Sequence, residues 1–244
     1  MDNTVPAGAA MLLDFIYRTD AGKAPPECYE TIFGHRQKHL PTPITKMTIG
    51  DLIDAQKNWS SKAWVKRNWG YSTASSAAGA AQFMKATLID LSKDLHLRGN
   101  QLFDADLQDR LAYHLLKRRG YEAFMAGQIS RTEFGKRLAM EWASLPVLAA
   151  TKGGSRTVKR GQSFYAGDGL NKSLVKPETV EALLDRVKAL ASKPAPAPAP
   201  SRPAPQPSAR AKPAGEKTRA SGSILAAFAL IVVAVVLFIA FGRS

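Results

Sequence analysis

Hydrophobic residues recur at helical spacing through most of the first 190 positions, whereas runs that alternate apolar and polar side chains are nearly absent. Residues 8–19 show the pattern well, with apolar side chains at i, i+1, i+4 and i+5 of one face. This helix is expected to end near Gly22, because glycine readily adopts the conformation that closes a helix. The spacing therefore predicts a mainly α-helical fold.

Six further helices are expected in the same part of the chain, one of them beginning after Thr48. Two segments are typical of loops: residues 23–45, which hold four prolines and a short strand near 29–33, and the Trp- and Ser-rich residues 59–76. The remaining predicted helices cover 78–95, 104–119, 121–125, 130–145 and 177–191.

The chain changes character at residue 192. Residues 192–223 are rich in Pro, Ala and basic side chains and hold eight of the 15 prolines, a composition typical of an extended linker. Residues 224–241 then run for 18 positions without a charge, Pro or Gly, which is long enough to span a bilayer as a helix. The sequence therefore predicts a domain over 1–191, a linker and one transmembrane helix.

Basic residues are more frequent before the apolar segment than after it. Arg210, Lys212, Lys217 and Arg219 precede it, and only Arg243 follows. Because positive charges favour the cytoplasmic side, the bias predicts a cytoplasmic N-terminal domain on a single-pass anchor in a host inner membrane or a virion.

The chain carries 34 Lys and Arg against 20 Asp and Glu, a net charge of +14, of which +8 falls within residues 1–191. Such a domain favours polyanions: nucleic acid, anionic lipid or the carboxylates of a cell wall. No nucleic-acid-binding motif or phosphate loop is present, so no nucleic-acid partner is expected. With Cys28 alone, and with His35 and His39 running into a proline loop, we expect no metal and no cofactor.

Residues 75–88 read Ser-Ser-Ala-Ala-Gly-Ala-Ala-Gln-Phe-Met-Lys-Ala-Thr-Leu. Small residues let a backbone approach a ligand or another helix closely, and the Gln82 amide has the donors and acceptors to bind a sugar or its N-acetyl group. A plain helix–helix contact through small side chains explains the same pattern.

The segment resembles the Ser/Ala-x-x-Gly-x-x-Gln-Phe/Leu-Met pattern of lysozyme-like muramidases and lytic transglycosylases, and residues 8–187 as a whole resemble the lambda-type phage lysozymes. In that family a first helix ends on a catalytic Glu, and a Tyr-Asp-x-Ile-x-Gly segment follows. The order matches here: residues 13–20, then Tyr-Glu-Thr-Ile-Phe-Gly at 29–34, Ala-Gly-Ala-Ala-Gln at 78–82 and Trp-Ala-Ser-Leu-Pro at 142–146.

The resemblance implies that Asp20 holds the position of the catalytic acid and that Tyr29, Ser76 and Gln82 contact substrate. Two departures stand out: the acid is Asp where the family has Glu, and Ala80-Ala81 replace the family's Arg-Tyr. Glycosidic cleavage needs a carboxylic acid with a raised pKa, and the negative end of a helix dipole favours such a shift. Asp is one methylene shorter than Glu, and an error of about 1 Å costs on the order of a hundredfold.

A second carboxylate is expected if the bond is hydrolysed, and Glu30 lies where the family has its Tyr-Asp. Glu30 also fits a surface charge, and Glu27 or Glu30 is the alternative acid. A site with one acid favours transglycosylation, in which an intramolecular attack leaves an anhydro-sugar. The sequence leaves the two reactions open.

Aromatic and amide side chains also gather in residues 161–171, where Tyr165, Asp168 and Asn171 suit a carbohydrate face. A tight turn with a buried Phe164 is the alternative. The Trp-rich loop is first interpreted as an aromatic cluster that pins the loop to the core, with saccharide, wall or membrane binding as alternatives.

These observations predict a peptidoglycan-degrading muramidase of endolysin or virion-associated type. Its expected partners are peptidoglycan and the lipid bilayer, and a holin or a virion protein is a further candidate partner. The alternative is a weak or inactive peptidoglycan-binding structural protein on a lysozyme fold.

Overall fold

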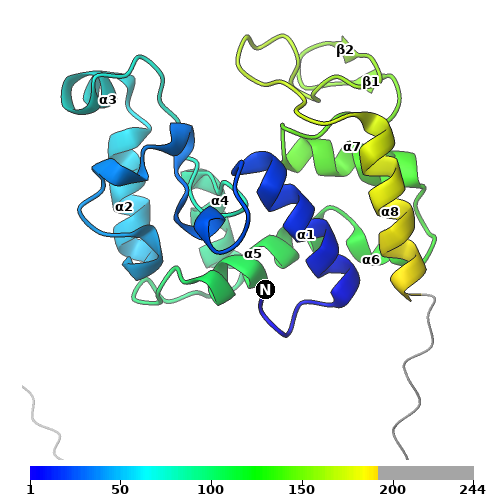
Figure 1. Cartoon of the computed structure of the whole chain (residues 1–244), viewed down its shortest axis with the longest axis horizontal. Helices are drawn as coiled ribbons and strands as arrows, with labels where there is room; N and C mark the ends of the chain where they lie inside the picture. The colour runs from blue at the N-terminus through cyan, green and yellow to red at the C-terminus, as the bar shows by residue number, and fades with distance from the viewer. Residues whose placement is uncertain (192–244) are drawn as a thin grey trace, which may run out of the picture. The chain divides into compact units, whose positions relative to one another are not determined.

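The computed structural model describes residues 1–191, so the expected linker (192–223) and transmembrane segment (224–241) lie outside the described residues. The described part contains eight α-helices and one two-stranded antiparallel sheet, which confirms the mainly α-helical class (Figure 1). None of its helices is both long enough and apolar enough to cross a membrane.

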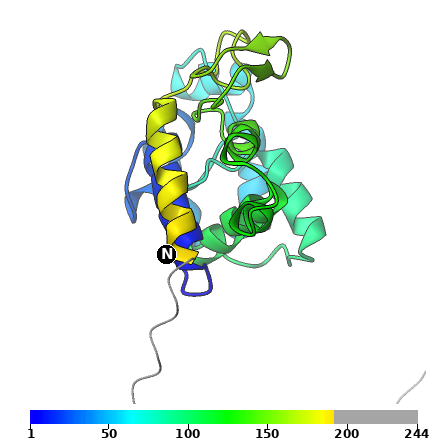
Figure 2. The ribbon, with the colours of Figure 1, turned by 90° about the vertical axis from the view of Figure 1, so that its right-hand side faces the viewer.

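Helix α1 (Ala7–Asp20) lies among later elements and is anchored by apolar side chains. Leu12, Leu13 and Ile16 are fully buried. Helix α5 (Ala105–Arg118) and helix α8 (Pro177–Ala191) both pack against α1, and Figure 2 shows α8 alongside it. The predicted ends of α1 and α8 agree closely with these bounds.

Helix α2 (Ile49–Trp59) packs against α3 (Lys62–Trp69) and α4 (Lys85–Asp94), which lie to the left of α1 in Figure 1. The side chain of Thr48 accepts a hydrogen bond from the Asp51 amide and so caps α2 at the predicted place.

On the other side of α1 lie α6 (Tyr121–Met125) and α7 (Arg131–Glu141). The strands β1 (Thr151–Lys152) and β2 (Thr157–Val158) follow and pair with each other. Helix α7 ends four residues before the predicted boundary because Trp142 adopts an extended conformation, with φ −114° and ψ 102°.

The prediction of a loop over residues 59–76 is wrong, because α3 lies within it. Ser61 accepts a hydrogen bond from the Trp64 amide at the start of α3, and Gly70 ends the helix in the left-handed conformation. These two capping residues were the sequence signals for a short helix.

The prediction that a helix begins at residue 78 is also wrong. Residues 78–83 form a tight turn, in which Ala78 pairs with Phe83, and α4 starts only at Lys85. The expected strand near 29–33 shrinks to one bridge between Ile32 and Ala78. The rest of the proline-rich segment contains four short 3-10 helices, Glu27–Glu30, Phe33–His35, Gln37–His39 and Ile44–Lys46.

Candidate functional site

Asp20 is the last residue of α1, and the pKa of its carboxyl group is shifted. Burial raises the pKa of Asp20 to about 6. The negative pole of the helix dipole acts in the same direction, since it disfavours a negative charge at the C-terminal end. Asp20 therefore has the property that a general acid requires near neutral pH.

Ser144 lies beside Asp20 and was not among the expected site residues. Its buried hydroxyl interacts with the Asp20 carboxyl and opposes the rise in pKa, without reaching full hydrogen-bond geometry to any described residue. The backbone carbonyl of Ser144 accepts a hydrogen bond of 2.8 Å from the Leu174 amide. The Trp-Ala-Ser-Leu-Pro motif, singled out in the sequence, was the signal for this residue.

The same motif is joined to the tight turn at 78–83. The indole N–H of Trp142 donates to the Ala81 carbonyl at 3.3 Å. The buried Gln108 side chain accepts from the Ala80 amide at 2.9 Å and donates to the Tyr29 carbonyl at 3.0 Å. The turn, the segment after Asp20 and the Trp142 motif are therefore held in one hydrogen-bonded assembly.

Gln82 and Ser76 both take part in this local structure. Gln82 has a left-handed φ of 47°, and its side-chain amide donates to the Gly79 carbonyl at 2.7 Å and to the Thr31 carbonyl at 3.2 Å. Ser76 is buried, and its hydroxyl accepts from the Lys85 amide at 3.0 Å. Both side chains therefore shape the turn through bonds within the protein.

Glu30 lies apart from Asp20 in its contacts. Its carboxylate accepts hydrogen bonds from the hydroxyl and the amide of Thr45. Glu27, Tyr29 and Glu30 line a cavity of about 480 Å³, and Asp20 is not among the residues that line it. A further cavity, of about 380 Å³ beside Tyr113, contains none of the expected site residues.

These features can be compared with known proteins. A family model described as Endolysin matches residues 47–169, just over half of the chain. The chain belongs to the Endolysin family. No curated protein and no solved structure matches it. Membership of this family implies a lytic enzyme of bacteriophage type that degrades peptidoglycan.

The matched range of this endolysin includes the turn at 78–83 and Ser144 but begins after Asp20 and Glu30. The family match therefore covers the later segments and leaves Asp20 outside the matched range. Asp20 is a candidate because of its place at the end of α1, its partly buried surroundings and its interaction with Ser144.

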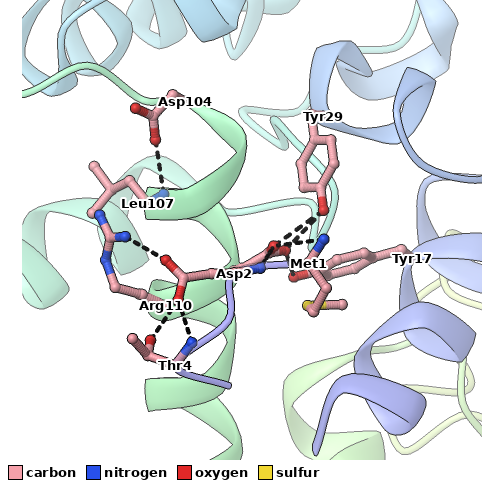
Figure 3. Close-up of polar contacts among 9 residues, drawn as sticks. Met1, Asp2, Thr4, Tyr17, Tyr29, Asp104, Leu107 and Arg110 are labelled. Atoms are coloured by element: carbon pink, nitrogen blue, oxygen red, sulfur yellow. Dashed lines mark hydrogen bonds and ion pairs between the residues drawn. The ribbon is translucent and has the colours of Figure 1, made fainter. Parts of the chain in front are cut away.

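Tyr29 is placed in the core. Its hydroxyl and that of Tyr17 donate to the buried carboxylate of Asp109, at 3.0 and 2.9 Å (Figure 3). The Asp2 amide donates to the same carboxylate at 2.7 Å. This network holds α1 and the segment before Glu30 against α5, and burial raises the pKa of both tyrosines. Tyr29 therefore has the surroundings of a structural residue.

The expected carbohydrate face at residues 161–171 is partly engaged within the protein. Tyr165 is partly buried, and its hydroxyl donates to the Met140 carbonyl at 2.7 Å. Asp168 is exposed, and hydrogen bonds from the backbone amides of Asn171 and Leu170 lower its pKa. The segment joins the motif near Asp20 through a bridge between Pro146 and Ser163.

Proposed function

We propose that this endolysin cleaves the bond between N-acetylmuramic acid and N-acetylglucosamine in peptidoglycan, with Asp20 as the general acid. The observation that carries this proposal is the Asp20 carboxyl at the end of α1, buried enough to raise its pKa to about 6 and placed against Ser144. The family supplies the substrate, and the lysozyme-like order of motifs supplies the type of bond.

In the proposed reaction the protonated Asp20 donates its proton to the glycosidic oxygen while the bond from that oxygen to the anomeric carbon breaks. The resulting Asp20 carboxylate then removes a proton from the attacking hydroxyl group. That hydroxyl belongs either to water, giving a reducing end, or to the sugar itself, giving an anhydro end. In both cases Asp20 finishes protonated, so the cycle closes.

Intramolecular attack is the better supported of the two outcomes. Hydrolysis uses a second carboxylate near the first, either to form a covalent intermediate or to activate water. Glu30 is held by Thr45 and lines a cavity that does not include Asp20. A single acid therefore fits the described contacts best, and we propose lytic transglycosylation.

A second function is favoured by one specific departure. Asp20 stands where lambda-type enzymes have Glu. Because its side chain is one methylene shorter, the acidic proton lies about 1 Å farther from the glycosidic oxygen. The alternative is therefore a peptidoglycan-binding protein with weak or no cleavage.

The test measures release of soluble fragments from purified peptidoglycan by the full-length protein in a non-ionic detergent. We expect release by the wild type and a loss of at least about a hundredfold in Asp20→Asn, because a general acid contributes that much. Asp14→Asn is the matched control, since Asp14 lies on the same helix and pairs with Arg18 at the surface. Product masses separate the reactions, because an anhydro end is lighter than a reducing end by one water.

Two other results would change the assignment. If the wild type is silent and Asp20→Glu cleaves, the fold positions residue 20 for catalysis, and the natural protein binds peptidoglycan without cleaving it. If neither the wild type nor Asp20→Glu releases fragments but both proteins sediment with peptidoglycan, the binding function replaces the enzymatic one.

We also propose that residues 224–241 anchor the protein in a membrane, with residues 192–223 as the linker and the domain on the cytoplasmic side. An endolysin anchored on the cytoplasmic side reaches the wall only after the membrane opens. A holin partner would open it. A virion component with the same anchor is the alternative arrangement.

A further inference from the structure

Positive charge is concentrated in one part of the domain. Residues 31–89 contain eight Lys and Arg but only two Asp and Glu, a net of +6 out of the +8 of residues 1–191. No acidic residue lies between Asp54 and Asp90. The remaining residues of the domain are therefore close to neutral.

Ion pairing sharpens this asymmetry. Outside residues 31–89, many arginines have a carboxylate partner: Arg18, Arg110, Arg118, Arg119, Arg131, Arg137 and Arg160. In the described part of the chain, by contrast, no carboxylate forms an ion pair with Lys38, Lys62, Lys66 or Arg67, all of which are exposed. Three of these cations lie on α3, which contains no acidic residue.

Four aromatic rings belong to the same segments as these cations and contact one another. Trp69 stacks on His39 with ring centroids 5.3 Å apart and meets Trp64 edge-on at 5.1 Å. Tyr71 meets His39 edge-on at 5.9 Å. His39 and Tyr71 are exposed, and Trp64 and Trp69 are partly buried against the core. We call these four rings, together with Lys38, Lys62, Lys66 and Arg67, the α3 surface.

The α3 surface is connected to the turn at 78–83 by contacts of residues 33–36. The guanidinium group of Arg36 lies 4.1 Å from the centre of the Tyr71 ring and donates to the Thr73 carbonyl at 2.6 Å. The Phe33 amide donates to the Ala77 carbonyl at 3.1 Å, next to the turn at 78–83. The segment that follows α3 therefore runs directly from the α3 surface to this turn.

We propose that the α3 surface binds peptidoglycan outside the cleavage site, pairing its cations with the carboxylates of the stem peptides. Carboxylates at intervals along a glycan strand match several unpaired cations on one short helix, and the partly exposed rings offer flat apolar faces to the sugars. The inference takes its ligand from the proposed function but concerns binding alone, so it is testable in a protein that cannot cleave.

The experiment uses the full-length Asp20→Asn protein in a non-ionic detergent and teichoic-acid-free sacculi, with binding measured by co-sedimentation over a range of salt concentrations. We expect Lys62→Gln, Lys66→Gln and Arg67→Gln together to weaken binding about tenfold and to reduce its salt dependence. The matched control changes Lys93, Arg98 and Arg186 to Gln. These residues are exposed and have no described ion pair, so the control removes the same charge and is expected to bind as before.

Sacculi whose carboxylates have been converted to neutral amides, by carbodiimide coupling to ethanolamine, identify the ligand, because their cross-linked network stays intact and still sediments. The protein with an unchanged α3 surface should lose about as much affinity on amidated sacculi as the α3 triple variant loses on untreated ones, and the triple variant should lose little more. The proposal is overturned if the triple variant binds untreated sacculi normally, or if its deficit persists on amidated sacculi. It is also overturned if the deficit appears only with mixed micelles of the detergent and phosphatidylglycerol, which would make the α3 surface a lipid-binding one. Cleavage is measured separately, with the protein that keeps Asp20. The binding result can therefore be interpreted even if the proposed cleavage reaction is not observed.

Discussion

At the scale of single residues, the acidity of Asp20 links its proposed role as an acid to the stability of the fold. Burial raises its pKa from 3.8 to about 6, so the folded protein holds this proton more tightly than the unfolded chain does. The stability that this proton contributes is complete below pH 3.8 and is lost as the pH rises through about 6. The charged Asp20 carboxyl therefore destabilises the fold at neutral pH.

Asp20→Asn mimics the protonated acid at every pH and should remove this cost. We expect the variant to be more stable than the wild type by about 2–3 kcal/mol at pH 8 and equally stable near pH 3.5. Denaturant unfolding of both proteins across this range measures the difference, with Asp14→Asn as the exposed control. A stability difference that does not change with pH would contradict the raised pKa. Over the same range, cleavage by the wild type should fall as the pH rises above 6, because the acid form is lost.

At the scale of elements, the turn at 78–83 contains a glycine at a position where any side chain would be strained and crowded. Gly79 has a φ of +76°, and a Cβ there would overlap Oε1 of Gln108 and lie 3.0 Å from the Phe103 ring. The Gly79 amide also donates to the Thr31 carbonyl at 2.7 Å, so the backbone has little freedom to shift. Backbone strain and steric overlap therefore act together at this position.

Gly79→Ala is expected to destabilise the fold by about 3 kcal/mol or more, since overpacking adds to the cost of a left-handed Ala. Gly70→Ala separates the two contributions. Gly70 has nearly the same φ, +78°, but no atom within 4 Å of the added Cβ, so about 1 kcal/mol is expected. Thermal and denaturant unfolding of both variants provide the comparison, and equal losses would mean that the packing around Gly79 relaxes.

The same elements show what local sequence patterns can and cannot predict. Helices α1 and α8 follow from the periodicity of apolar residues within their own segments. The left-handed Gln82 was not predictable in this way, because its side chain is bonded to Thr31, far away in the sequence. Asp20 was proposed as the acid through resemblance to a family. Its partner Ser144 was missed because the contact joins the end of α1 to the segment after α7.

At the scale of the whole molecule, the chain combines a basic domain with a C-terminal sequence that is chemically different. Residues 224–241 would form a helix about 27 Å long, close to the apolar thickness of a bilayer of about 30 Å. Residues 192–223, if extended as polyproline II, would reach about 100 Å.

Deletion of residues 224–241 is therefore expected to move the protein from the membrane fraction to the soluble fraction while leaving fragment release from purified peptidoglycan unchanged. Replacing the segment with 18 Leu and Ala residues is the matched control and should keep the protein in the membrane, because hydrophobic length alone satisfies the bilayer. Fractionation after high-salt and alkaline washes measures this. The basic α3 surface and linker permit a second explanation for membrane association, namely electrostatic binding, and release of the full-length protein by salt alone would establish it.

Protease added to spheroplasts then tests the orientation of the protein in the membrane. A domain on the cytoplasmic side leaves the linker protected from the protease, whereas digestion from outside would place the enzyme on the side of the wall.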